Sequence, residues 1–317
     1  MRSVLKSYIP FFIWLLLATF AFAQPPHRIG YVAGGPGPTF DAFREGLREA
    51  GYVEGRDIVI ETRFSEGRAD RFPALIGELL ERKVDLLVAG SPPGAIAAIK
   101  TDTTTPIVIA GVGDPAGIAK RLGRPAAHIT GTTLPIKGIA NRWLEILRET
   151  RPDATHVAVL TNPANPSRAI WMSDLEESAR AAGVKLEVHD VGDKYALAKA
   201  LAAISAGGAR ALIVTGDPVF VFDRAQIVAF AQECGLATVY FSKLFVDDGG
   251  LMAYGPSLED SYRKAPRYVD RILKGAKPAE LAMEPSRVEL VVNLRTARAQ
   301  GVTIPAAIVK RADRVIE

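Results

Sequence analysis

Small and polar residues gather in six short turns of this sequence, each directly after a run of apolar or β-branched residues. The turns are 34–39, 90–94, 113–115, 161–166, 215–218 and 242–245. Glycine lets the backbone approach a bound molecule, proline stiffens a turn or begins a helix, and Ser, Asn or Asp places a polar group beside free helix N–H groups. Taken singly, each of these turns is better explained by helix capping, but together they predict a ligand cleft.

The candidate ligand contacts lie in or beside these turns. In chain order they are Gly35, Pro36, Phe40, Ser91, Pro92, Gly113, Asp114, Asn162, Asn165, Asp217, Ser242, Phe245 and Tyr254. We expect Ser91 and its neighbouring amides to hold a carboxylate, because a helix N-terminus attracts anions. We expect Asp217 to pair with an ammonium group, with capping of the following helix as the alternative.

Aromatic residues near the turns fall into two groups. Phe40 and Phe245 lie just past strand ends, where they are expected to sandwich a flat apolar group of the ligand. The others are expected to belong to the core: Phe220, Phe222, Tyr240 and Phe241.

The motifs of several enzyme and cofactor classes are missing from the sequence. The turn at 34–37 does not spell GxGxxG, and neither GxxxxGK[ST] nor GxSxG occurs. Pro92 directly after Ser91 removes an N–H that an oxyanion hole would use. The four histidines are scattered without metal-ligand spacing. We therefore predict a protein that is not an enzyme and that has no cofactor and no metal.

Strand-like and helical patterns alternate along the chain, which is typical of an α/β protein with helices on both faces of a sheet. Strands are expected at 28–33, 58–64, 84–89, 107–111, 157–160, 186–188, 211–214, 238–241, 251–254 and 288–292, and helices at 72–80, 139–147, 227–231 and 258–272. The series restarts near His156, so two doubly wound units fit the length of 317 residues. The late elements exceed one closed unit, which predicts that the chain crosses back between two lobes.

The first 23 residues have the pattern of a secretory signal. Arg2 and Lys6 precede an apolar stretch at 11–18, and Ala21-Phe22-Ala23 is a small-x-small cleavage pattern. The apolar stretch is shorter than the roughly 20 residues that span a bilayer. We expect cleavage after Ala23 and no stable membrane insertion afterwards. The 39 Lys and Arg against 35 Asp and Glu are spread along the chain, which argues against a nucleic-acid partner.

Five long segments resemble a known family. They are 52–90, which contains VIETRFSEGRADRFPALI, and 106–115, 157–166, 250–281 and 289–305, which contain PIVIAGVGDP, VAVLTNPANP, GLMAYGPSLEDSYRKAP and ELVVNLRTARAQG. The chain resembles, from His27 to its end, the ABC-transporter substrate-binding family that includes tryptophan- and tyrosine-binding members. In the first turn this chain has Gly34-Gly35-Pro36-Gly37, where serines often occur in the family.

The resemblance implies a type I periplasmic-binding-protein fold, with two Rossmann-like lobes joined by three crossover strands. Residues 28–132 and 249–281 would form lobe 1, and residues 133–248 and 282–317 would form lobe 2. The ligand-contacting turns would be those around Ser91, Asp114, Asn162, Asp217 and Ser242.

The resemblance also implies a monomeric periplasmic protein that passes a small solute to an ABC permease in the inner membrane. An aromatic or branched amino acid is the first choice of ligand, and an aromatic carboxylate without an amine is the second. A ligand-sensing module for a membrane chemoreceptor or kinase, or an exported enzyme of the same fold, stays open from the sequence. A DNA-binding regulator is disfavoured by the signal and by the absence of a helix-turn-helix before His27.

Overall fold

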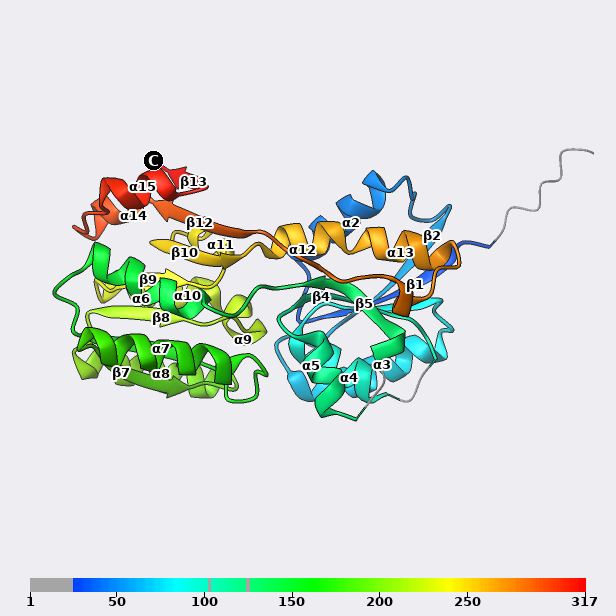
Figure 1. Cartoon of the computed structure of the whole chain (residues 1–317), viewed down its shortest axis with the longest axis horizontal. Coiled ribbons are helices and arrows are strands. Elements are labelled where there is room, and N and C mark those ends of the chain that lie inside the picture. The colour runs from blue at the N-terminus through cyan, green and yellow to red at the C-terminus, as the bar shows by residue number, and fades with distance from the viewer. Residues whose placement is uncertain (1–24, 102–103, 124–125) are drawn as a thin grey trace, which may run out of the picture.

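A computed structural model describes residues 25–101, 104–123 and 126–317, so the predicted signal at 1–23 lies outside the described residues. Two sheets form the centres of two lobes that lie end to end (Figure 1). The sheet of the first lobe is parallel and has the order β11-β5-β4-β3-β1-β2. Its strands are β1 His27–Ala33, β2 Ile58–Phe64, β3 Leu86–Ala89, β4 Ile107–Val112, β5 Ile129–Thr133 and β11 Glu284–Pro285.

Within the described residues, six α-helices cover the first sheet. They are α2 Pro38–Glu49, α3 Phe72–Glu81, α4 Pro92–Lys100, α5 Pro115–Arg121, α12 Leu258–Lys264 and α13 Pro266–Leu273. Side chains of α3, α4 and α5 form one core cluster with Val32, whereas α2, α12 and α13 share the other cluster with Ile29 and Tyr31. Successive residues of β1 thus supply opposite faces, as the period of two along a strand requires.

The second sheet has the order β13-β12-β10-β9-β8-β6-β7, and only its β10–β12 pair is antiparallel. Its strands are β6 His156–Thr161, β7 Lys185–Asp190, β8 Ala211–Val214, β9 Ala237–Tyr240, β10 Met252–Pro256, β12 Val288–Asn293 and β13 Arg314–Ile316. The helices around it are α6 Ile139–Thr150, α7 Arg168–Ala182, α8 Lys194–Gly207, α9 Pro218–Phe222, α10 Arg224–Glu233, α11 Lys243–Asp247, α14 Leu294–Ala299 and α15 Ala306–Arg311. Both faces carry buried apolar clusters, so the predicted α/β class with two doubly wound lobes is confirmed.

The chain passes between the lobes three times, and two crossings differ from the predicted positions. It leaves the first sheet after Thr133, returns between β10 and α12, and leaves again between β11 and β12. The predicted return at Gly249 comes too early, because β10 pairs with β9 and β12 of the second sheet. The predicted departure after Leu281 also comes too early, because Glu284 and Pro285 pair with β5. Figure 1 shows the late α12 and α13, in orange, lying in the first lobe.

The predicted helix at 258–272 is divided in the structure. Proline has no N–H for the helical hydrogen bond and its ring crowds the preceding turn. Pro266 accordingly begins α13 directly after the cap of α12 at Ala265.

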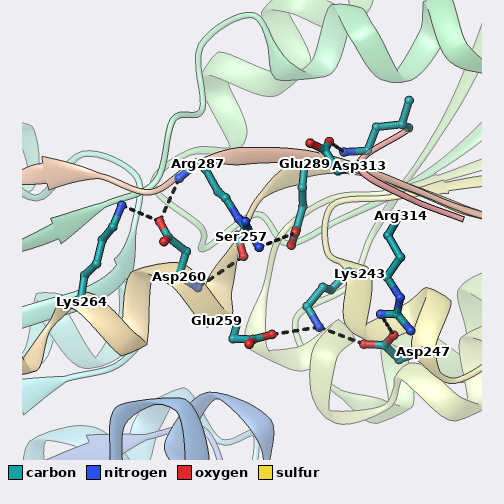
Figure 2. A network of polar contacts seen from close by, with 11 residues as sticks. Lys243, Asp247, Ser257, Glu259, Asp260, Lys264, Arg287, Glu289, Asp313 and Arg314 are labelled. Atoms are coloured by element: carbon teal, nitrogen blue, oxygen red, sulfur yellow. Dashed lines mark hydrogen bonds and ion pairs between the residues drawn. The ribbon is translucent and has the colours of Figure 1, made fainter. Parts of the chain in front are cut away.

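Polar contacts fix the last two crossings side by side (Figure 2). The N–H of Ser257 donates to the Arg287 carbonyl over 2.8 Å. The N–H of Arg287 in turn donates to the Asp260 carboxylate over 3.1 Å. Lys243 of the second lobe reaches Glu259 at the start of α12 over 3.1 Å, so an ion pair joins the lobes beside the crossings.

Candidate functional site

A cavity of about 290 Å³ lies between the two lobes. Its lining comes from strand β4, from the segments after β1, β3, β5, β8 and β9, and from helices α2, α4, α9, α10, α11 and α12. The lining residues are Ala33, Gly34, Gly35, Pro36, Pro38, Thr39, Gly90, Ser91, Pro92, Gly111, Leu134, Gly216, Asp217, Pro218, Val221, Phe222, Arg224, Phe241, Leu244, Leu258 and Tyr262. The cavity is near the lower end of the sizes usual for ligand pockets, so it fits a small molecule.

The first turn leads into α2, whose N-terminus opens on the cavity. Pro38 and Thr39 line the cavity, and Gly37 caps the helix with a φ of 133° that only glycine adopts readily. Among the described residues, no side chain caps this helix end. The N–H groups at the start of a helix carry a partial positive charge, so this end of α2 suits an anion.

Ser91 lines the cavity, and the amides that follow it in α4 already have partners within the turn. Its Oγ accepts the N–H of Gly94 over 3.2 Å, and its carbonyl accepts the N–H of Ala95 over 2.8 Å. Pro92 and Pro93 have no N–H at all. The hydroxyl proton of Ser91 is therefore a group that this turn can offer to a ligand.

We expect Ser91→Ala to weaken ligand binding by roughly 0.5–1.5 kcal/mol, the usual net worth of one hydrogen bond. The same change removes the cap of α4 and should lower the free energy of unfolding by about 1 kcal/mol. Calorimetric titration and chemical denaturation measure the two effects separately. Equal binding of the ligand and its methyl ester would contradict a contact from Ser91 to a carboxylate.

Asp217 is buried at the N-terminus of α9 and faces the cavity. Its Oδ1 accepts the N–H of Val219 over 3.0 Å, and its Oδ2 accepts Nδ2 of Asn165 over 2.8 Å. Burial raises the pKa of this carboxyl, while hydrogen bonds from Asn165, Asn162 and Val219 offset part of the rise. The structure thus shows the predicted capping role. The carboxylate can still accept from a ligand, because each oxygen has two lone pairs.

Arg224 is the cation that lines the cavity among the described residues. It lies at the start of α10, with Nε 2.9 Å from the Asp248 carboxylate. One guanidinium nitrogen also donates to the Val221 carbonyl over 3.0 Å. Its charge is therefore already compensated within the second lobe.

Two aromatic rings form apolar walls, and glycines make room for them. Tyr262 lies against Gly90 and Gly111, where an added Cβ would come within 3.0 Å of its side chain. Its hydroxyl donates to the Gly90 carbonyl, and burial raises its pKa, so it stays protonated. In the second lobe the ring of Phe241 lies against Gly216, where an added Cβ would be 2.5 Å from the ring.

The structure brings some of the predicted contacts together at the cavity and places others elsewhere. The cavity is lined by Gly35, Pro36, Ser91, Pro92 and Asp217. Asn165 and Asn162 lie behind it as partners of Asp217. The remaining candidates lie outside the lining: Phe40, Gly113, Asp114, Ser242, Phe245 and Tyr254.

The predicted aromatic pair packs into the two lobes instead of flanking the cavity. Phe40 contacts Tyr31 with ring centroids 4.7 Å apart and so belongs to the core around α2. Phe245 is fully buried and stacks on Tyr240 at 4.6 Å. Their places past the strand ends were identified correctly, but the helix that follows each strand turns the ring inward.

The other candidates have structural partners. Asp114 caps α5 by accepting the N–H of Gly117 over 2.8 Å, and Ser242 caps α11. The Tyr254 carbonyl accepts Nε1 of Trp143 over 2.6 Å. Gly113 lies against Ile136 and Ser167 of the neighbouring segments.

Sequence reasoning missed the cation Arg224 and the residues that form most of the apolar wall, which are Leu134, Val221, Phe222, Phe241, Leu244, Leu258 and Tyr262. Phe222 and Phe241 were expected in the core. Each lies within five residues of a predicted turn, and this proximity could have indicated a place in the cavity lining. Tyr262 gives no such signal, because it lies on the apolar face of a helix that returns from the other lobe.

Among the described residues, no helix is both long enough and apolar enough to cross a membrane. Two α/β lobes, three crossings and a cavity between the lobes define the type I periplasmic-binding-protein class. The chain belongs to the ABC transporter substrate binding protein family, whose model matches residues 37–316. This is a family of substrate-binding proteins and not of enzymes.

Three similar proteins illustrate the family and the fold. A tyrosine-binding protein of Clostridioides difficile (strain R20291) is 22% identical over 269 residues, which cover 83% of this chain and 77% of the relative. The ABC domain from Streptococcus pneumonia in complex with L-Trp has a TM-score of 0.80 at 22% identity, covering 92% of this chain and 100% of that one. A ligand-free, open substrate binding protein with adhesive properties from Clostridium difficile has a TM-score of 0.62 at 22% identity, covering 92% and 99%.

Proposed function

We propose that this protein is the exported substrate-binding protein of an ABC importer and that it binds an aromatic amino acid between its lobes. The observation that carries the proposal is the cavity itself. It is lined from both lobes, its walls are mainly apolar, and it contains one buried carboxyl group and one open helix N-terminus. Two similar proteins, the tyrosine-binding protein and the ABC domain in complex with L-Trp, support the same ligand class.

The chemistry of the lining suggests an orientation for the ligand. The carboxyl of Asp217 would take the ammonium group, and the start of α2 at Thr39, together with the Ser91 hydroxyl, would take the carboxylate. Asp217 and the start of α2 belong to turns that face each other, since Pro218 lies 3.5 Å from the position of a Cβ on Gly34. The side chain of the ligand would then lie against the rings of Phe241 and Tyr262.

Binding would close the lobes about the three crossings. The contact between Gly34 and Pro218 supports a closed arrangement in this structure. The higher TM-score with the L-Trp complex than with the ligand-free, open protein supports it as well. We expect saturating ligand to lower the radius of gyration in small-angle scattering.

Substrate-binding proteins of this family are exported. We infer that the signal is cleaved after Ala23 and that the mature monomer delivers its ligand, in the periplasm, to an ABC permease of the inner membrane. Neighbouring genes for a permease and an ATPase would support import, whereas a neighbouring chemoreceptor or kinase gene would favour sensing.

The test is to purify the mature chain and identify the small molecule that copurifies with it by mass spectrometry. Calorimetric titration with L-tryptophan, with L-tyrosine and with the matching amine-free carboxylates then assigns the ligand class. We expect one equivalent of an amino acid to bind without turnover. Binding of the amine-free acid alone would replace the amino acid in the proposal, and chemical conversion of the bound compound would overturn a binding role.

A further inference from the structure

The short helix α9 of the second lobe rests on glycines of the first lobe. Phe222, at the end of α9, has its ring 3.8 Å from the position of a Cβ on Gly35 and 3.7 Å from that of a Cβ on Gly67. Pro218, at its start, contacts Gly34 in the same way at 3.5 Å. We call these three glycines, Gly34, Gly35 and Gly67, the glycine seat.

The seat is a defined surface formed by two loops. The N–H of Gly67 donates to the Gly34 carbonyl over 3.3 Å, which holds the loop after β2 beside the loop after β1. Gly67 has a φ of +77°, a conformation that favours glycine, whereas Gly35 has an ordinary φ. A larger side chain at Gly35 would therefore be tolerated by the backbone but would enter the space of the Phe222 ring.

Phe222 is exposed yet lines the cavity. Its exposed fraction is 55%, unusual for a large apolar side chain. The other large apolar side chains that are exposed among the described residues, Val53, Val188 and Tyr195, do not line this cavity. A ring with one side toward solvent and another toward the cavity stands at the mouth of the cavity.

We propose that Phe222, seated on Gly35 and Gly67, is the gate that retains the bound ligand and sets its rate of dissociation. The inference rests on the proposed function, because it assumes that a ligand occupies this cavity. When the lobes separate, the ring leaves the seat and the mouth opens. The seat therefore controls residence time without touching the polar groups of the ligand.

The test compares Phe222→Ala, Gly35→Leu and the double variant, with L-tryptophan and L-tyrosine as probes in stopped-flow displacement. Phe222→Ala should raise the dissociation rate about tenfold, whereas the association rate should change much less. Gly35→Leu should have a similar effect by displacing the ring. The double variant should be no worse than either single variant, because both changes act through the same contact.

Matched controls separate the gate from general damage. Tyr195→Ala removes an exposed aromatic ring that is outside the cavity, and Gly192→Leu adds the same side chain to a loop glycine with open space around it. Both controls should keep the dissociation rate of the parent protein. An unchanged rate in Phe222→Ala, or additive effects in the double variant, would overturn the gate.

Scattering of the ligand-free protein distinguishes failure of the gate proposal from failure of the proposed function. If neither probe binds the parent protein, the proposed ligand class fails, and scattering of the ligand-free protein decides the role of the seat. Gly35→Leu should then give a larger radius of gyration than the parent and Gly192→Leu, because the lobes can no longer meet at the seat. Equal radii in all three proteins would overturn the proposal.

Discussion

Asp217→Asn should reduce the affinity for an aromatic amino acid by roughly 2–5 kcal/mol and leave the affinity for the matching amine-free acid nearly unchanged. The carboxylate lines the cavity and belongs to a buried residue, so an ammonium group loses its buried partner in the variant. Asparagine is isosteric and caps helices well, so the hydrogen bond to the Val219 N–H should persist. Calorimetric titration with both compounds measures the difference.

The pH dependence of binding gives an independent check on the same group. Burial raises the pKa of Asp217 above its ordinary value of 3.8. The protonated carboxyl therefore stabilises the fold below the unfolded pKa, and this contribution is lost as the pH rises through the folded pKa. An ammonium ligand needs the charged form, so its affinity should fall as the pH is lowered through the raised pKa. Asp217→Asn should remove this dependence.

Asp193 provides the matched control for Asp217→Asn. It caps α8 by accepting the N–H groups of Tyr195 and Ala196 over 2.9 Å, but it is exposed and lies outside the cavity. Asp193→Asn should leave both affinities unchanged. Equal losses for the amino acid and the amine-free acid in Asp217→Asn would reduce Asp217 to a helix cap and would favour an aromatic carboxylate as the ligand.

Gly46→Ala should lower the free energy of unfolding by roughly 1–3 kcal/mol, although alanine is the better helix former. Gly46 lies inside α2 at its closest approach to α12, and an added Cβ would come 2.2 Å from the Arg263 carbonyl oxygen. The obstacle is backbone, so the helices must separate. Because α12 carries Tyr262, the variant should also bind ligand more weakly.

Gly77→Ala is the control, with the opposite expected sign. Gly77 lies inside α3 and an added Cβ would have no neighbour within 4 Å. Only helix propensity should act there, so the free energy of unfolding should rise by roughly 0.5–1 kcal/mol. Urea denaturation of both variants measures the contrast. A gain in stability in Gly46→Ala would show that α2 and α12 are farther apart than the structure places them.

Most strands of the described residues were predictable from the sequence because β-branched runs between polar turns have few alternatives. The ranges predicted for β2 and β8 coincide with the observed ones. The strands β5, β11 and β13 were missed. In β11, Glu284 and Pro285 carry no strand pattern and become a strand only by pairing with β5. The second and third crossings between the lobes lie later in the chain than predicted for the same reason. Pairing partners far along the chain decide which sheet a strand joins.

The site was predictable where it depends on strand ends and not where it depends on packing between lobes. Ser91 and Asp217 follow β3 and β8, and parallel strands bring such turns to one edge of a sheet. Phe222 reaches the cavity because glycines of the other lobe admit its ring, which no local pattern encodes. Tyr262 arrives on a helix that crosses back from the second lobe.

The aromatic cluster behind Phe241 gives the protein an intrinsic fluorescence signal for ligand binding. Trp143 and Trp171 lie 6.1 Å apart, with ring centroids 6.2 and 5.4 Å from that of Phe241. The third tryptophan, Trp14, falls within the predicted signal, so cleavage leaves only these two indoles. A compound that binds against Phe241 in the cavity should change the surroundings of both buried indoles through that ring. Unlabelled mature protein can therefore be screened against small molecules that do not themselves fluoresce, with its tryptophan emission as the signal.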